Sequence, residues 1–145
     1  GLLPDGCFPV TVEEITQRYL HIPNRKIIWN NFLLVIQEVK SQAWYSNKCK
    51  LLIDGGFTSD KQITKDVDVL LVISDLNDAD AFAALCWVGK EHYRFKNNFQ
   101  VDMYPYHAKI SSNNFQVFFT YVKLDECLSR GAPVHTRKGL LELII

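Results

Sequence analysis

The stretch LLIDGGFTSDKQITKDVDV, residues 51–69, is the part of the sequence from which the fold class is predicted. It contains an apolar run that ends at a pair of glycines, then a polar segment, and then a second apolar run that opens with aspartates. Short apolar runs bounded by turn residues are typical of β-strands, and a nearly continuous run is typical of a strand covered on both faces. The stretch therefore predicts strands at 49–53 and 67–73, joined by a polar connection.

Helices are expected before these strands. Thr11 and Glu14 have the spacing of a capping box, which predicts a short helix that the next proline ends. Asn24 can cap a second, longer helix, in which apolar residues recur at intervals of three and four to about Trp44. The sequence thus predicts a helical N-terminal part over residues 11–46.

After these strands, one more helix and further strands are expected. Asp78 or Asp80 can cap a helix that runs to about Gly89 with three side chains inward, namely Phe82, Leu85 and Cys86. Further strands are expected at 99–104, 115–122 and 140–145, and residues 1–10 are expected to form an irregular arm. This order predicts an α+β domain, a mixed β-sheet with helices packed mainly on one face.

Composition limits the classes of protein to which the chain can belong. With 145 residues, of which 48% are hydrophobic and 22% charged, it can bury one core and is expected to form a single domain over 1–145. Its 16 basic and 16 acidic side chains give a formal net charge of zero, which argues against a duplex nucleic-acid partner. No apolar run approaches the roughly 20 residues that span a bilayer, so no membrane partner is expected. The N-terminus lacks the features of a signal peptide.

The cysteines and histidines lie far apart in the sequence. The four cysteines and four histidines have none of the close pairs that zinc and redox motifs need. The sequence therefore predicts a reduced, cytoplasmic protein without a zinc site. No chemical role is expected for His92 or His135, and Tyr104 is expected in the core or at its rim.

Asp66 and Asp68 are the first candidate site residues. They stand two positions apart at the start of the strand expected at 67–73, so both side chains should point to the same face. Two adjacent carboxylates repel each other unless a cation lies between them or one of them takes up a proton. Oxygen ligands from one or two carboxylates, completed by substrate phosphates, are what Mg²⁺ prefers. The pair therefore predicts a site for Mg²⁺, with Mn²⁺ as the alternative ion.

A phosphate-binding segment is expected directly before this pair. Gly55 and Gly56 allow a tight turn whose backbone N–H groups can approach an anion closely. Thr58, Ser59 and Lys61 follow and can add hydroxyl donors and a positive charge. The segment thus predicts a phosphate cradle beside the metal site.

Asp102 is the third candidate acid. It stands between Val101 and Met103 in the strand expected at 99–104. If that strand neighbours the one that carries the first pair, the three carboxylates converge and can hold two metal ions around an in-line displacement. Asp54, by contrast, is expected to accept hydrogen bonds from turn amides at the end of its strand.

The combination of these motifs resembles the signature of the DNA polymerase β-like nucleotidyltransferase superfamily. That signature is a glycine pair, a spacer, an acid–apolar–acid–apolar strand and a third acid on a later strand. Gly55-Gly56, Asp66-Val67-Asp68-Val69 and Asp102 match it in order, and the resemblance covers roughly residues 49–104. It implies a nucleotidyltransferase fold for the single domain.

The resemblance also implies an activity. It implies Mg²⁺-dependent transfer of a nucleoside monophosphate from a triphosphate such as ATP to a hydroxyl group. Asp66 and Asp68 would bind the metal ions that carry the triphosphate, Asp102 would ligate the second ion and activate the acceptor, and Gly55 and Gly56 would contact the phosphates. The small size resembles that of antitoxin-type minimal nucleotidyltransferases, some of which modify a partner toxin. The acceptor is thus a protein side chain, a small molecule or an RNA end.

Two alternatives stay open. The acids at 66 and 68 could instead form a solvated junction between a loop and a strand. Many members of the superfamily have serine at the position of Gly56, so a non-catalytic protein that keeps the fold and neutralises a partner by binding is the second hypothesis. The apolar end of the chain, residues 140–145, also allows pairing with another copy, although a strand within the sheet is simpler.

Overall fold

The fold is known from a computed structural model that describes residues 4–19, 21–54, 57, 65–109, 130–131 and 139–145. The residues predicted to form a strand at 115–122 lie outside these ranges. In chain order the elements are β1 (Cys7–Thr11), α1 (Val12–Tyr19), α2 (Pro23–Lys40), β2 (Lys50–Asp54), β3 (Val67–Val72), α3 (Asp78–Phe99), β4 (Val101–Tyr106) and β5 (Leu140–Ile144).

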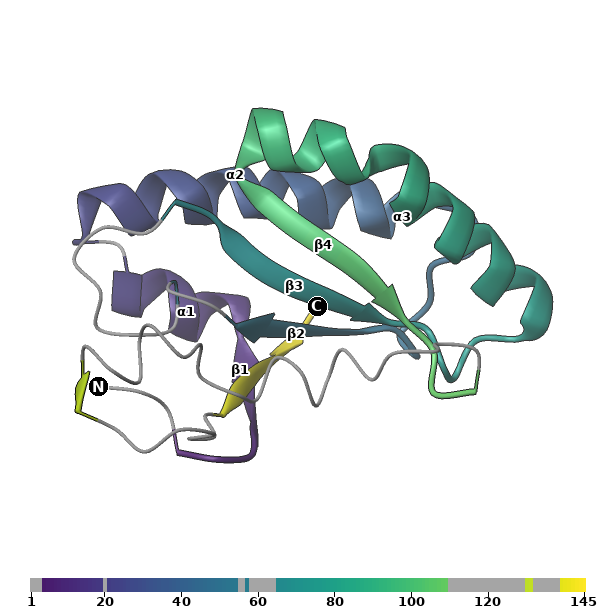
Figure 1. Cartoon of the computed structure of the whole chain (residues 1–145), viewed down its shortest axis with the longest axis horizontal. Helices are drawn as coiled ribbons and strands as arrows, with labels where there is room; N and C mark the ends of the chain where they lie inside the picture. Colours follow the sequence, from purple (N-terminus) through teal and green to yellow (C-terminus); the bar gives the residue numbers. More distant parts are fainter. Residues whose placement is uncertain (1–3, 20, 55–56, 58–64, 110–129, 132–138) are drawn as a thin grey trace.

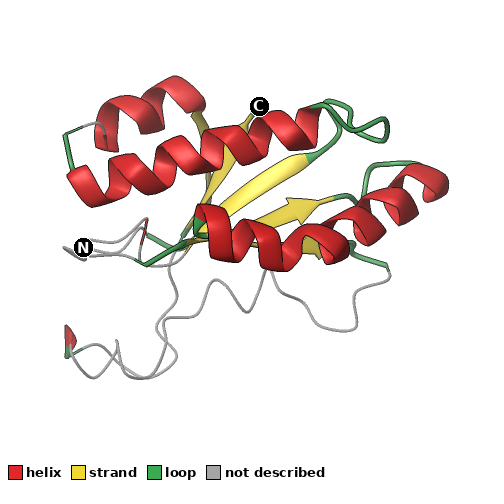
Figure 2. Ribbon diagram, turned by 90° about the horizontal axis from the view of Figure 1, so that it is seen from above, coloured by secondary structure: helices red, strands yellow, loops and turns green. Residues whose placement is uncertain are grey.

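Within the described residues, the strands form one mixed sheet of five strands in the order β1-β5-β2-β3-β4. β2 pairs antiparallel with both of its neighbours, β5 and β3, whereas the outer pairs β1–β5 and β3–β4 are parallel. The helices α2 and α3 lie side by side along the sheet (Figures 1 and 2). The α+β class with a mixed sheet is therefore confirmed, and the last strand of the chain lies inside the sheet rather than at its edge.

The two faces of the sheet carry different side chains. Val67, Val69 and Leu71 of β3 belong to the large core that also contains the buried side chains of all three helices. Leu70, between them, packs on the other face with Leu52 and Leu140. Because successive side chains of a strand alternate between faces, even-numbered positions of β3 lie on the face away from the helices. The helices thus cover one face, and Asp68 lies on the other.

The helix boundaries confirm one predicted cap and correct two others. The Thr11 N–H donates to Glu14 Oε2 at 2.8 Å, and the Glu14 N–H donates to Thr11 Oγ1 at 3.2 Å, so the predicted capping box forms at α1. The cap predicted at Asn24 is wrong, because α2 begins one residue earlier with Pro23 as its first residue. α3 is capped by Asn77 rather than by an aspartate, since the Asn77 side chain accepts from the Asp80 N–H at 2.8 Å.

α3 is longer than predicted and faces the core with different residues. It continues ten residues past Gly89, to Phe99. Phe82, Leu85 and Cys86, predicted to point inward, are exposed, and the core-facing side chains are instead Ala81, Ala84, Val88 and Phe95. Small alanines let the helix lie close to the sheet, which the hydrophobic pattern alone does not reveal. Among the described helices, none has the length and apolar character that crossing a bilayer requires.

The strands differ from prediction at two places. Residues 7–11 form β1 and pair with β5 from Cys7↔Leu140 onward, so the irregular arm predicted over 1–10 is wrong for that part. β4 was expected to stop at Pro105, yet it continues to Tyr106. Proline is tolerated there because β4 is an outer strand of the described sheet, where its missing N–H costs no ladder bond on the open side.

Two glycines provide opposite tests of this packing. A Cβ at Gly139 would collide with the Pro4 carbonyl oxygen and lie 2.7 Å from the Phe8 ring, whereas a Cβ at Gly89 meets nothing within 4 Å. Gly139→Ala should therefore lower the free energy of unfolding by about 1–3 kcal/mol. Gly89→Ala, inside an exposed stretch of α3, should raise it by about 1 kcal/mol. Urea unfolding of both variants checks this, and equal effects would contradict the placement of β1 against β5.

Candidate functional site

An acidic row crosses three neighbouring strands on the face away from the helices. Asp68 pairs in register with Asp54 of β2 on one side and with Asp102 of β4 on the other. Asp66 precedes β3 by one residue. The three carboxylates were expected to converge if the strand that carries Asp102 neighbours the strand that carries Asp68. The two strands are adjacent in the sheet.

Three of these acids come close enough to share a cation. Asp66, Asp68 and Asp102 each offer one carboxylate oxygen, and these oxygens all lie within 4.8 Å of one another. Asp66 and Asp68 are half-buried, whereas Asp102 is only 8% exposed. Asp54, although buried and in the same row, is not part of this group. The predicted set of three converging carboxylates is therefore present.

A neighbouring tyrosine forms a hydrogen bond with the Asp102 carboxylate. The Tyr104 hydroxyl donates to Asp102 Oδ2 at 3.3 Å. Burial, and then the negative charge of Asp102, raise the pKa of Tyr104 above its ordinary value, and the more distant charges of Asp68 and Asp66 act in the same direction. The phenol therefore keeps its proton at neutral pH and remains a donor. Tyr104 was expected at the core or its rim, but its hydroxyl also orients the third acid.

Two side chains of α3 that the sequence did not single out also reach Asp102. His92 Nε2 lies 3.7 Å from Asp102 Oδ1, and Lys96 Nζ lies 3.7 Å from Asp102 Oδ2. The residues stand four positions apart on α3 and so lie on the same side of the helix. This spacing is the sequence signal that could have grouped the two residues. It applies only if both lie on one helix, and the helix predicted from the sequence ended near Gly89. The structure thus places His92 beside the third acid.

The donor set fits a divalent cation. Asp102 Oδ1 is buried and accepts no hydrogen bond from a described residue. A buried carboxylate oxygen without such a donor is costly unless a positive charge lies near it. Three carboxylates, one of them with a buried oxygen that accepts no hydrogen bond from a described residue, match the hard oxygen ligands that Mg²⁺ and Mn²⁺ take. Asp66, Asp68 and Asp102 are the residues that would hold the ion.

The residues predicted to bind phosphate lie outside the described residues; they are Gly55, Gly56, Thr58, Ser59 and Lys61. Phe57, which lies between them in the sequence, is described and packs against the helices. The Phe57 ring is fully buried and lies 4.8 Å from the Tyr19 ring and 6.1 Å from the Trp29 ring, between centroids. The buried guanidinium of Arg25 donates from Nε to the Phe57 carbonyl oxygen at 3.1 Å. This anchor could not be predicted from the sequence, because its members come from three separate segments.

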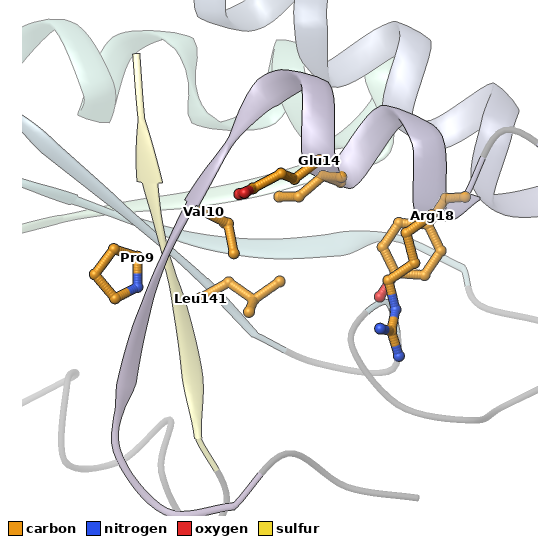
Figure 3. Close-up of a pocket in the computed structure, with 7 residues that line it drawn as sticks. Pro9, Val10, Glu14, Arg18 and Leu141 are labelled. Carbon is orange, nitrogen blue, oxygen red and sulfur yellow. The ribbon is translucent and has the colours of Figure 1, made fainter.

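A pocket elsewhere on the molecule does not belong to the acidic site. It has a volume of about 370 Å³, and its lining comes from β1, α1 and β5, including Val10, Glu14, Arg18 and Leu141 (Figure 3). Leu141 belongs to the large core, on the helix side of the sheet. β1 and β5 lie at the opposite edge of the sheet from β4. The pocket and the acids are therefore on different faces and at different edges.

The repulsion among the acids should be measurable without any metal. Asp68→Asn removes one negative charge from a row of like charges, so in the presence of a chelator it should raise the melting temperature by roughly 1–4 °C. The control is Asp75→Asn, which removes an exposed aspartate outside the group and should leave the melting temperature unchanged. A decrease for Asp68→Asn in calorimetry would show that this carboxylate stabilises the metal-free fold.

Comparison with known proteins places the chain in a family without giving it an activity. No curated protein matches the chain, and no solved structure matches it. One family model matches residues 1–144, nearly the whole chain, and its description is a family of unknown function. The chain therefore belongs to the family of unknown function DUF6932.

Proposed function

We propose that this protein is a Mg²⁺-dependent nucleotidyltransferase with a polymerase β-like nucleotidyltransferase fold. It would transfer a nucleoside monophosphate from a triphosphate to a hydroxyl group and release pyrophosphate. The observation that carries the proposal is the convergence of Asp66, Asp68 and Asp102 within 4.8 Å, from two adjacent parallel strands. The order of a glycine pair, two spaced acids and a later acid supports it, because this is the order that the superfamily signature has.

The metal ions would supply charge neutralisation for the phosphate oxygens and would stabilise the attacking and leaving oxygens. Asp66 and Asp68, which are half-buried, would bind the triphosphate side of the site through their ion. Asp102 faces the acceptor side in this assignment and would draw the proton from the attacking hydroxyl. The Tyr104 hydroxyl, 3.3 Å from Asp102 Oδ2, would hold that carboxylate in one orientation. Catalysis would thus consist mainly of positioning and electrostatic stabilisation.

The phosphates would be bound beside the end of β2. Gly55 and Gly56 follow Asp54 directly in the chain, and Thr58, Ser59 and Lys61 come next. The anchoring of Phe57 by Arg25 and by the rings of Tyr19 and Trp29 supports this assignment, since a rigid neighbour limits the conformations of the residues around it. Backbone N–H groups can serve as phosphate donors only when their direction is fixed.

The acceptor to test first is a hydroxyl group on a partner protein, as for the antitoxin-type enzymes that the chain resembles. A small molecule or an RNA end would satisfy the same chemistry, although zero formal net charge gives no general attraction to RNA. We place the reaction in the cytoplasm, where Cys49 and Cys86 would stay as thiols, the state in which the structure shows them.

A binding-only protein is the second candidate, and one observation favours it. Large apolar side chains are exposed along α3, with Phe82 at 68% and Tyr93 at 74% of their full exposure and Leu85 between them in the sequence. Exposed apolar side chains that share one side of a helix are suited to contact with another protein. In this case the protein would neutralise its partner by binding, and the acids would have no catalytic role.

Transfer of label from a nucleoside triphosphate separates the two candidates. Incubation with each α-labelled triphosphate, Mg²⁺ and cell lysate should give a labelled product with the wild type. Asp68→Asn should lower the rate by at least about a hundredfold, since metal ligation contributes several kcal/mol to such reactions. Asp75→Asn, the exposed control, should keep the wild-type rate. A wild type that gives no product with any triphosphate, yet still binds a partner, would contradict the enzyme proposal.

A further inference from the structure

The side chain of His92 is held in one orientation over the outer strand β4. Its Nδ1 lies 3.0 Å from the Met103 carbonyl oxygen. A carbonyl oxygen can only accept, so Nδ1 carries a proton in this contact. The ring also contacts the rings of Tyr93 and Tyr104, with centroids 5.4 Å and 5.0 Å away. These contacts hold the direction of the ring, with Nε2 toward Asp102.

Nε2 is the ring nitrogen that faces the acidic site. His92 Nε2 lies 3.7 Å from Asp102 Oδ1, the buried oxygen that accepts no hydrogen bond from a described residue. The His92 side chain is 21% exposed. A buried carboxylate oxygen is costly without a positive charge near it, and at this position the charge can come from a proton on Nε2 or from a metal ion that Nε2 and Oδ1 bind together.

The distance favours a metal ion in that position. At 3.7 Å the two atoms are too far apart for a direct hydrogen bond, which needs about 2.7–3.2 Å. Two ligand atoms that each bind a metal ion at about 2.1 Å are separated by about 3 Å when adjacent and by about 4.2 Å when opposite. The observed separation lies between these two limits. Nε2 and Oδ1 can therefore bind one ion with only small movements.

We infer that His92 Nε2 is a nitrogen ligand of the ion bound by Asp102, so that this site selects a first-row transition ion such as Mn²⁺ over Mg²⁺. The inference rests on the proposed acidic metal site and specifies which ion it takes. Mg²⁺ binds oxygen ligands almost exclusively, whereas imidazole nitrogen suits transition ions. The Nδ1–Met103 hydrogen bond is the type of outer contact that orients a histidine ligand and raises its basicity.

Lys96 opposes this binding from the other side of the same carboxylate. Its Nζ lies 3.7 Å from Asp102 Oδ2, and its side chain is 46% exposed and can turn away into solvent. A positive charge at that distance lowers the affinity of Asp102 for a cation. Lys96→Met should therefore tighten Mn²⁺ binding by a few fold, in the opposite direction to a change at His92.

The test uses Mn²⁺ itself as the probe, with the whole chain. Titration followed by the EPR signal of free Mn²⁺ gives the affinity, and pulsed EPR of the bound ion detects a directly bound nitrogen. His92→Asn is the matched variant, because the amide of asparagine can replace Nδ1 as the donor to Met103 but offers nothing at the position of Nε2. We expect nitrogen coupling in the wild type. In His92→Asn we expect loss of this coupling and a decrease in the preference for Mn²⁺ over Mg²⁺ on the order of tenfold.

The outcomes separate this inference from the proposed function. If the wild type binds Mn²⁺, Asp68→Asn weakens that binding, and the spectra show no nitrogen coupling, the acidic site stands and the role of His92 is wrong. If the wild type binds neither Mn²⁺ nor Mg²⁺, both proposals are wrong. The spectrum of the wild type is decisive by itself, so the inference stays testable even if His92→Asn does not fold.

Discussion

The position of the acidic row depends on the pairing of β3 with β4, which begins at the junction of α3 and β4. The Val67 N–H at the start of β3 donates to the Gln100 carbonyl oxygen at 3.0 Å. Gln100 is the one residue between helix and strand, and it adopts the left-handed conformation with φ 55°. Its N–H donates to the Phe95 carbonyl oxygen, and its Oε1 accepts from Asn31 Nδ2 of α2 at 2.8 Å. One residue thus ends the helix, starts the strand and sets the register.

That register determines the chemistry of the site. Because side chains alternate along a strand, a shift of β4 by one residue would turn Asp102 into the helix-side core and Met103 to the opposite face. In the observed register Asp102 stands opposite Asp68, while Val101 and Met103 pack in the core. The parallel pairing also brings the first residues of both strands to the same edge, where Asp66 precedes β3. Repulsion among the acids is offset in part by Lys96 from α3.

Much of this arrangement could be predicted from the sequence, and the reasons are local. Patterns within a few residues predict the two central strands and the capping box at Thr11. They also identify the acids at positions 66, 68 and 102. The extent of α3 could not be predicted, because after Gly89 its one buried side chain is Phe95, which is too few apolar positions for a helical periodicity. β1 was missed because Pro9 within it, and Pro4 and Gly6 before it, are turn signals, and only pairing with the distant β5 makes the segment a strand. His92 was missed for a related reason, since its role depends on which strand lies under α3.

The anchor of Phe57 shows the same limit. The ring of Phe57 and the guanidinium of Arg25 are separated by 32 positions in the sequence, and neither has a local signal for contact with the other. Contacts of this kind arise from packing in three dimensions, so they can be identified only from the structure. The candidate site therefore combines acids that a motif identifies with supporting residues that only the fold identifies.

Binding of one divalent ion by Asp66, Asp68 and Asp102 can be measured by anomalous diffraction from crystals grown with Mn²⁺. The anomalous signal locates the ion without reference to any assumed ligand. We expect a strong peak within about 2.5 Å of the carboxylate oxygens of these three residues. A well-ordered acidic row without a peak, in crystals that bind Mn²⁺ elsewhere, would contradict it.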